Sequence, residues 1–312
     1  MNVVFFGTSE FALPSLRELI ASRHKVLAVV TQPDRKKGRN LQLMPPPTKV
    51  LAETHNIPVC QPEKASSADS VGYLKTLGAD LFVVVSFGQI LSKELLAIPK
   101  TFAINVHGSL LPKYRGAAPT NWAIINGDAA SGVTIMKMNE RLDEGDIISK
   151  EEIPIDKEDT NITLGEKLSE LGAKALLGTL DDMAEDRPLR FTPQDHSAAS
   201  YAPKLKKENG LIKWNEPAAR IHDKVRGFLP WPGAYTRFDG KTLKILRTEI
   251  TSEQLPGRAS GEVVDIVKNK GMVVKTGDSA LIVTHLQLEG KKVLDTDAFL
   301  RGHRIDIGYR FK

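Results

Sequence analysis

The sequence of 312 residues is 41% hydrophobic and 26% charged, which predicts a folded chain and excludes an intrinsically disordered one. Its length exceeds the usual domain of about 100–200 residues, so two domains are expected. The single cysteine, Cys60, excludes an intrachain disulfide and a cysteine-rich zinc site.

No apolar run approaches the roughly 18–20 residues that are needed to cross a bilayer. Residues 2–6 are apolar, but the acidic Glu10 follows them, and neither a basic leader nor a small-residue cleavage site is present. We therefore expect neither a secretory nor a transit peptide, and a cytoplasmic protein.

The net charge of +5 is distributed unevenly along the chain. Residues 1–203 carry 22 Lys and Arg against 25 Asp and Glu, a net of −3, whereas residues 204–312 carry 21 against 13, a net of +8. A basic C-terminal part indicates contact with a polyanion such as RNA, although surface lysines also serve solubility alone.

Apolar, β-branched runs alternate with helix-like stretches over residues 1–186. Continuous apolar strands between helices are typical of a parallel sheet covered on both faces. The sequence therefore predicts an α/β fold class, with a Rossmann-like, mostly parallel sheet domain. The expected strands are 3–6, 26–31, 81–85, 102–106, 133–138 and 147–155, and the expected helices are 10–21, 49–56, 66–77, 119–126 and 164–184.

The first predicted strand is followed by the turn Gly7-Thr8-Ser9-Glu10. It lacks the G-x-G-x-x-G pattern with an acidic partner, and the chain has no G-x-x-x-x-G-K-[ST]. Binding of a nicotinamide cofactor or of a nucleoside triphosphate therefore has little support. Gly7 is expected to serve the tight backbone turn.

A polar pair marks the exit of the run 101–106. Asn105 and His107 are two residues apart, so their side chains share one face of a strand. An amide can donate a hydrogen bond to a developing oxyanion, and an imidazole can transfer protons near neutral pH. Asp143 is a candidate carboxylate to steer the imidazole, and Asp146 is its rival. This set suits acyl transfer to an amine, although such residues also occur as ordinary turn and packing residues.

The C-terminal region reads as a linker followed by a small β domain. Residues 187–207 are rich in proline, serine and charge, which is typical of a linker. A short helix is expected at 216–225. Five strands with turn signals between them, of which Asp239-Gly240 is the clearest, predict a small barrel of the OB type. These strands are expected at 235–238, 241–246, 261–266, 272–275 and 280–288.

The run from Asn105 to Pro119, with Ser109-Leu110-Leu111-Pro112 at its centre, closely resembles the signature of the folate-dependent formyltransferases. The similarity extends from Phe6-Gly7-Thr8 to the stretch 228–235. The residues 114–119, followed by Trp122 and by 126–128, resemble the members of this family that act on methionyl-tRNA. The resemblance also singles out Asp143, through its Leu-Asp-x-Gly pattern.

This resemblance implies an enzyme that uses 10-formyltetrahydrofolate as formyl donor and the α-amine of methionyl initiator tRNA as acceptor, for translation initiation. Direct attack of the amine on the formyl carbon would give a tetrahedral intermediate. The expected domains are a catalytic domain at 1–186, a linker at 187–207 and a C-terminal OB-like, tRNA-binding domain at 208–312. No metal is expected, because the remaining histidines lack ligand spacing and H-E-x-x-H is absent. A monomer is expected.

The resemblance also implies roles for further residues. The basic, proline-rich loop 32–47 would enter the acceptor end of the tRNA. Phe11 would contact the methionine side chain, although its helical spacing with Leu13 and Leu16 equally suits a core position. The implied folate-binding residues are Ser109, Leu110, Leu111, Pro112, Phe87, Gly88, Gln89, Ile90 and Leu91, and the implied tRNA-binding residues are Arg39, Lys36, Lys37, Lys204, Lys206 and Lys207.

Two alternative functions are weighed against this one. A formyltransferase for glycinamide ribonucleotide or for an amino-sugar nucleotide shares the chemistry. The glycinamide ribonucleotide enzyme normally lacks a basic C-terminal barrel. The amino-sugar nucleotide enzymes normally have a different sequence after the segment 109–112. The other alternative is a non-catalytic RNA-binding protein, which the basic C-terminal part alone supports.

Overall fold

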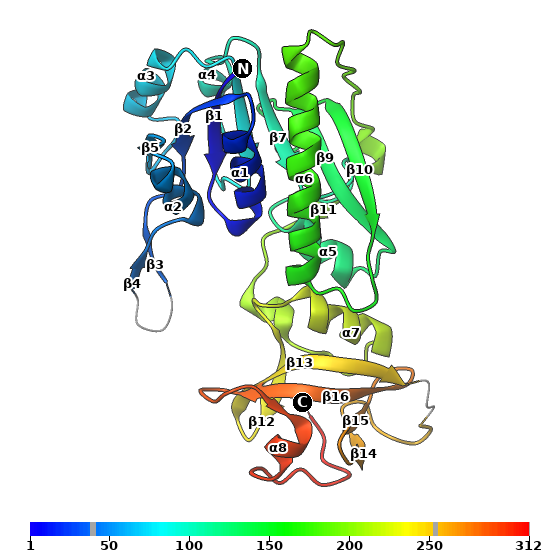
Figure 1. Cartoon of the computed structure of the whole chain (residues 1–312). Helices are drawn as coiled ribbons and strands as arrows, with labels where there is room; N and C mark the ends of the chain where they lie inside the picture. Colours follow the sequence, from blue (N-terminus) through cyan, green and yellow to red (C-terminus); the bar gives the residue numbers. More distant parts are fainter. Residues whose placement is uncertain (38–41, 252–254, 312) are drawn as a thin grey trace. The chain divides into compact units, whose positions relative to one another are not determined.

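The computed structural model describes residues 1–37, 42–251 and 255–311 (Figure 1). Contacts divide the chain into two units. The first comprises Met1–Pro119, Ala130–Pro154 and Gly165–Pro203, and the second comprises Thr120–Ala129, Ile155–Leu164 and the chain from Lys204 onward.

A seven-stranded sheet forms the first unit, with the strand order β10-β9-β7-β6-β1-β2-β5. The strands β7, β6, β1, β2 and β5 are parallel, β9 pairs antiparallel with β7, and β10 pairs antiparallel with β9. In chain order the parallel strands stand as 3-2-1-4-5, so the order reverses between β1 and β6, where α/β sheets bind ligands. The strands are β1 (Asn2–Gly7), β2 (Lys25–Val30), β5 (Val59–Cys60), β6 (Leu81–Val85), β7 (Ala103–His107), β9 (Ala130–Lys137) and β10 (Ile147–Pro154).

Helices cover both faces of this sheet because its strands are apolar on both sides. Val3 and Phe5 of β1 belong to one buried cluster, and Val4 and Phe6 belong to the other, as the alternation of strand side chains requires. The helices α1 (Leu13–Ala21), α2 (Pro47–Thr54) and α6 (Asn161–Ala184) contribute to the first cluster, and α3 (Ala68–Thr76) and α4 (Lys93–Leu96) to the second. The predicted Rossmann-like sheet is thereby confirmed.

Several elements of the first unit were not predicted. The segment 32–47, expected as a loop, contains an antiparallel hairpin of β3 (Arg35–Lys37) and β4 (Gln42–Met44). The short strand β5 and the single-turn helix α4 give too little periodicity to be recognised. The predicted helix 10–21 begins as a 3₁₀ helix, η1 (Glu10–Ala12), before α1. A two-stranded parallel pair joins β8 (Arg115–Gly116) to β11 (Tyr201–Ala202), which lies in the expected linker.

An antiparallel sheet forms the second unit, in the order β12-β13-β16-β15-β14, with β17 also paired to β16. The five predicted strands are confirmed, and Asp239 and Gly240 have φ of 47° and 75°, as a tight hairpin turn requires. The strands are β12 (Ala234–Phe238), β13 (Lys241–Thr251), β14 (Val263–Val267), β15 (Gly271–Lys275), β16 (Ala280–Leu288) and β17 (Leu294–Asp295). The other elements of the chain are α5 (Pro119–Ile125), η2 (His196–Ala198), η3 (Lys207–Gly210), α7 (Ala218–Gly227) and α8 (Thr296–Leu300).

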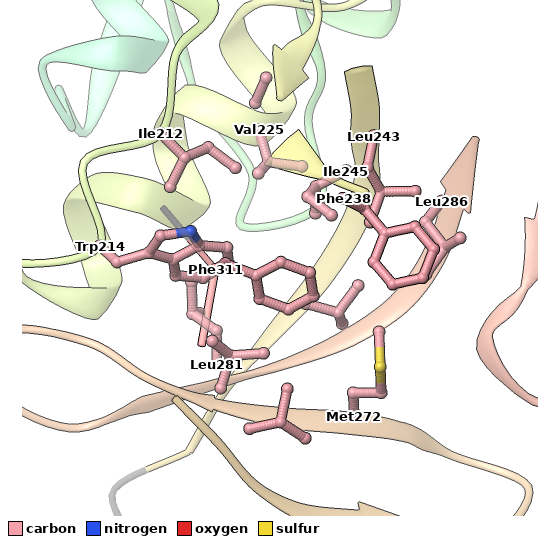
Figure 2. Packing of buried hydrophobic residues seen from close by; sticks show 14 of the residues in the cluster. Ile212, Trp214, Val225, Phe238, Leu243, Ile245, Met272, Leu281, Leu286 and Phe311 are labelled. Carbon is pink, nitrogen blue, oxygen red and sulfur yellow. The ribbon is translucent and has the colours of Figure 1, made fainter. Parts of the chain in front are cut away.

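The core of the second unit is one buried cluster of side chains from this sheet, α7, α8 and the C-terminal segment, part of which Figure 2 shows. Val225 of α7 joins Leu243 and Ile245 of β13 in one buried cluster. Trp214 stacks on Phe311, with ring centroids 5.7 Å apart. The second unit therefore has an apolar core of its own. Among the helices of the described chain, none combines the length and the apolar character needed to cross a membrane.

A remote carboxylate caps the start of α7. Asp278, in the turn between β15 and β16, accepts a hydrogen bond from Ala218 N at 2.9 Å, and this bond holds the pKa of Asp278 below its usual range. Asp278→Ala is expected to lower the free energy of unfolding at pH 7 by about 1 kcal/mol. Because the folded-state pKa is depressed, this contribution is present above the unfolded-state pKa and is lost as the pH falls through the folded value.

Urea unfolding at pH 7 and at pH 3, followed by tryptophan fluorescence, measures the effect. Trp122, Trp214 and Trp231, the three tryptophans of the chain, all lie in the second unit, so their fluorescence reports on it. Glu249→Ala is a matched control at the surface, because its carboxylate is 3.9 Å from Lys270 Nζ. Equal stability of the Asp278→Ala variant and the wild type at pH 7 would contradict the capping role.

Candidate functional site

The turns that follow β1 and β6 meet at the switch point of the sheet. Thr8 Oγ1 donates a hydrogen bond to Phe87 O at 3.0 Å, and Ser9 Oγ donates to Ser86 Oγ at 2.7 Å. The neighbouring strand β7 runs parallel to β6 and ends at the same edge with His107. Residues 86–91 and the polar pair of β7 are therefore presented at one edge of the sheet.

Asn105, His107 and Asp143 meet at this edge. Asn105 Nδ2 lies 3.4 Å from Asp143 Oδ1, and His107 Nδ1 lies 3.8 Å from the same oxygen. All three residues are at most 9% exposed. Asn105 and His107 share a face of β7, as their spacing predicts, and Asp143 comes from the connection between β9 and β10. Of the two carboxylates considered from the sequence, Asp143 makes these contacts.

The two ring nitrogens of His107 have different surroundings. Nε2 lies 2.9 Å from the carbonyl oxygen of Tyr114. A carbonyl oxygen only accepts hydrogen bonds, so Nε2 carries a hydrogen and the ring orientation is fixed by this bond. Nδ1 faces the Asp143 carboxylate. Nδ1 is therefore the ring nitrogen that no backbone carbonyl of the described chain holds.

The connection between β9 and β10 holds Asp143 in an unusual backbone conformation. Asp143 has φ of 54°, in the left-handed region that side chains other than glycine rarely adopt. Its Oδ2 accepts a hydrogen bond from Gly116 N at 2.8 Å. At Gly145 an added Cβ would lie 1.7 Å from Lys137 O, so only glycine fits there. The backbone on both sides of the carboxylate is thus tightly determined.

Sequence reasoning missed two buried polar residues beside this connection. Arg115, 1% exposed, donates from Nε and Nη2 to Gln194 Oε1 at 3.1 and 2.8 Å, and its Nη1 lies 3.2 Å from Glu144 Oε1. Gln194, 6% exposed, donates to the carbonyl oxygens of Asp143 and Gly145, each at 2.8 Å. Arg115 stands inside the recognised motif, whereas nothing in the sequence around Gln194 indicates its contacts.

The segment 109–112, for which the sequence implies folate contact, is a turn that Thr134 holds with two hydrogen bonds to its backbone. Thr134 Oγ1 donates to Ser109 O at 2.7 Å and accepts from Leu111 N at 3.1 Å. Ser109 and Leu111 are fully buried, whereas Leu110 and Pro112 are half-buried. A ligand at this turn would therefore meet backbone atoms and the side chains of Leu110 and Pro112.

Residues 87–91, which follow β6, also include both buried and exposed side chains. Phe87 and Leu91 are both 2% exposed and belong to the core, so their side chains are not free to enclose a ring. Gln89 uses its side chain to bind the backbone of Ala65 at 2.8 Å and of Glu63 at 3.3 Å. Gly88 is exposed, with φ of 84°, and the side chain of Ile90 is 72% exposed. Ile90 and the backbone here are the groups a ligand can reach.

The residues implied in tRNA contact lie in two places. Lys36 and Lys37 belong to β3, where Lys36 is exposed, and Arg39 lies outside the described residues. At the root of this hairpin, the Gln61 amide and the Lys49 ammonium bind Asp34 and hold its pKa below the usual range. The second group, Lys204, Lys206 and Lys207, is exposed at the start of the C-terminal part of the second unit.

Phe11 lies on η1, is half-buried, and packs against the core cluster of β1 and α1. Within the part of the chain that the structure describes, no group of three or more His, Cys, Asp or Glu side chains could hold a metal ion. A surface pocket of about 560 Å³ is lined by residues of β5, α3 and the connection between them, from Cys60 to Tyr73. Its lining includes none of the residues that the sequence implies for catalysis or for folate, tRNA or methionine contact.

Comparison with known families and proteins shows the family of the chain. The family described as formyl transferase matches residues 1–180, and the formyl transferase C-terminal domain matches residues 204–304. The methionyl-tRNA formyltransferase of Geobacter sulfurreducens is 47% identical over 312 residues, covering 99% of this chain and 96% of the relative. That of Citrifermentans bemidjiense is 48% identical over 308 residues, covering 99% and 95%.

Solved structures share the fold at much lower identity. A sugar 3N-formyl transferase, WlaRD, crystallised with dTDP and 5-N-formyl-THF, matches with a TM-score of 0.67 at 18% identity, over 94% of this chain and 99% of that one. The N-formyltransferase of Helicobacter canadensis, in complex with folinic acid and dTDP-3-aminofucose, matches with a TM-score of 0.67 at 19% identity, over 90% and 98%. These likenesses establish the architecture of the chain.

Proposed function

The chain belongs to the formyl transferase family, and from this premise we propose that it transfers a formyl group from 10-formyltetrahydrofolate to the α-amine of methionyl initiator tRNA. The observation that carries the proposal is identity of 47% and 48%, over 99% of the chain, with proteins named methionyl-tRNA formyltransferase. The enzyme is a one-carbon group transferase of translation initiation, and folate acts as its co-substrate.

The reaction makes a bond between the amine nitrogen and the formyl carbon and breaks the bond from that carbon to the folate N10. Negative charge grows on the formyl oxygen as the amine attacks. We assign the Asn105 amide as donor to this oxygen, because its contact with Asp143 is long at 3.4 Å and its second N–H is free for a ligand.

The amine must lose a proton and the folate nitrogen must gain one. We assign this transfer to His107 Nδ1, because Nε2 is bound to the Tyr114 carbonyl. Asp143 orients the ring from 3.8 Å. The Gly116 N–H bond to Asp143 Oδ2 keeps the carboxylate in position as an acceptor.

The residues present fit a folate co-substrate. Exposed Ile90 offers an apolar surface for an aromatic ring, and the half-buried Leu110 and Pro112 offer another. The backbone of residues 86–91 supplies polar groups for the edge of a pterin. In this proposal Ser109, Leu111, Phe87 and Leu91 act by shaping the backbone, since their side chains are buried.

The domain assignment is part of the proposal: catalytic at 1–186, linker at 187–207 and tRNA-binding at 208–312. The net charge of +8 over residues 204–312 supports contact between the C-terminal part and tRNA. Phe11, half-buried on η1, is proposed to contact the methionine side chain. We propose that the enzyme acts as a monomer in the cytoplasm.

The test is an assay with purified protein and 10-formyltetrahydrofolate. Methionyl initiator tRNA, glycinamide ribonucleotide and an amino-sugar nucleotide are offered in parallel as acceptors. Formylation of the aminoacyl-tRNA alone is the expected result. If the protein formylates one of the two small amines in preference to the tRNA, that amine is the acceptor. If it binds tRNA without transfer, the result favours a non-catalytic RNA-binding protein.

Arg39→Ala is expected to lower kcat/KM for methionyl-tRNA by roughly 10- to 100-fold, the loss typical of one hydrogen bond to a charged group. Basic residues of the hairpin that contains Lys36 and Lys37 would neutralise phosphates at the acceptor end, so the loss should shrink as salt is raised. Steady-state kinetics at 50 and 200 mM salt measure both effects. Lys75→Ala, which removes an exposed lysine paired with Glu94 on the same unit, is the control, and unchanged tRNA kinetics of Arg39→Ala would exclude the contact.

A further inference from the structure

We propose that Gln194 is a positioning residue for Asp143, and that Arg115 holds Gln194 in place. The inference rests on the proposed function, because it concerns the carboxylate that serves His107. It assigns a role in catalysis to a residue of the segment 187–207, which the sequence predicts to be a linker.

Every hydrogen-bonding group of the Gln194 side chain is engaged. Its Nε2 donates to Asp143 O and to Gly145 O, each at 2.8 Å, and its Oε1 accepts two bonds from Arg115. A primary amide is the side chain that combines two such donors with an acceptor. Glutamine therefore bridges the backbone on both sides of Glu144 and fixes the residue that carries the catalytic carboxylate.

This connection needs external support. Asp143 has φ of 54°, in the left-handed region that residues with a side chain adopt less readily than glycine. Gly145 is pressed against Lys137 O and cannot carry a side chain of its own. Bonds from Gln194 to both carbonyl oxygens oppose relaxation of the backbone toward an ordinary conformation, which would turn Asp143 away from His107.

Arg115 links this bridge to the rest of the site. Its guanidinium is 1% exposed and lies between Gln194 Oε1 and Glu144 Oε1. Its chain neighbours contact the other two groups, since Tyr114 O binds His107 and Gly116 N binds Asp143. Residues 114–116 and Gln194 therefore act together on the imidazole and on the carboxylate.

The segment around Gln194 is anchored to the sheet. Phe191 packs edge-on against Phe102 at 5.7 Å, and Lys137 Nζ lies over both rings. Thr192 exchanges backbone hydrogen bonds with Ile147 at 2.8 and 2.9 Å. Gln194 is the one buried residue among residues 187–199, all of which are described.

Gln194→Met tests the inference, since methionine has similar volume and cannot form the four bonds. The expected result is a single-turnover rate of formyl transfer that falls roughly 10²-fold, as for a small misplacement of a catalytic group, with unchanged KM for both substrates. Gln194→Glu, which keeps the acceptor for Arg115 but removes both donors, should be equally slow. Thr76→Val, which removes an exposed bond to Tyr73 O on α3 of the first unit, should retain the wild-type rate.

A double-mutant cycle distinguishes positioning from general stability. If Gln194 acts through Asp143, then Gln194→Met should cost little further rate when Asp143 is already replaced by asparagine. A wild-type rate for Gln194→Met, or an equal loss in both backgrounds, would overturn the inference.

Amide hydrogen exchange gives a measure that does not depend on turnover. In Gln194→Met the Gly116 N–H should lose protection, because its acceptor Asp143 Oδ2 moves away, while Val133 in β9 should keep its protection. Unchanged protection of Gly116 would contradict the inference even if the wild-type protein proved to formylate no acceptor. Lack of all transfer by the wild type would instead refute the proposed function.

Discussion

His107→Ala is expected to lower kcat for formyl transfer by roughly 10²–10⁴-fold, the usual contribution of general acid–base catalysis. The variant removes Nδ1, which faces Asp143 at 3.8 Å, and leaves the amine and the folate nitrogen without a proton carrier. KM should change little, because the assigned role concerns proton movement during the reaction. Pre-steady-state measurement of the transfer step checks the result.

Two further variants sharpen this test. His107→Gln retains an N–H that can donate to Tyr114 O, so it separates the loss of proton transfer from the loss of a structural hydrogen bond. It should be nearly as slow as His107→Ala. His55→Ala removes an exposed histidine at the end of α2 and should retain the wild-type rate. Near-normal transfer by a folded His107→Ala protein would remove the histidine from catalysis.

Asn105→Ala is expected to raise the barrier by about 2.7–4 kcal/mol, roughly 10²–10³-fold in kcat, as the loss of one oxyanion donor does. The amide lies at the carboxyl end of β7, 9% exposed, where a hydrogen bond to a developing charge is not weakened by bulk water. Asn105→Asp keeps the shape of the side chain and places a negative charge next to Asp143, so it should be at least as slow.

Comparison of kcat and KM for these two variants checks the assignment of Asn105. A defect confined to KM would mean that the amide binds substrate without stabilising the transition state. If Asn105→Ala keeps the wild-type kcat, a group other than Asn105 donates the hydrogen bond to the oxyanion.

Much of the architecture could be predicted from local patterns. Fully buried strands such as Leu81–Val85 read as continuous apolar runs, and Asp239-Gly240 marks its hairpin. The pair Asn105 and His107 could be placed on one face from the strand period alone. Asp143, 38 positions from Asn105, could be chosen over Asp146 only through a family pattern.

The contacts that the sequence did not reveal join residues far apart in the chain. Gln194 binds Arg115 and Asp143 across 79 and 51 positions, and no periodicity or motif encodes such pairs. Its surroundings, rich in proline and charge, resemble a linker because residues 187–199 are exposed or half-buried apart from the glutamine. Burial of single side chains was also beyond the sequence, since the implied folate contacts Phe87 and Leu91 pack into the core with their side chains.

The most direct test of the central claim is a crystal structure of the protein with bound 5-formyltetrahydrofolate, a formylated folate of the kind found with related folds. We expect the pterin against the backbone of residues 86–91 beside Ile90, and the folate N10 within hydrogen-bonding reach of Asn105 or His107. Binding in the pocket lined from Cys60 to Tyr73, or at any place from which Asn105, His107 and Asp143 cannot reach the folate, would contradict it.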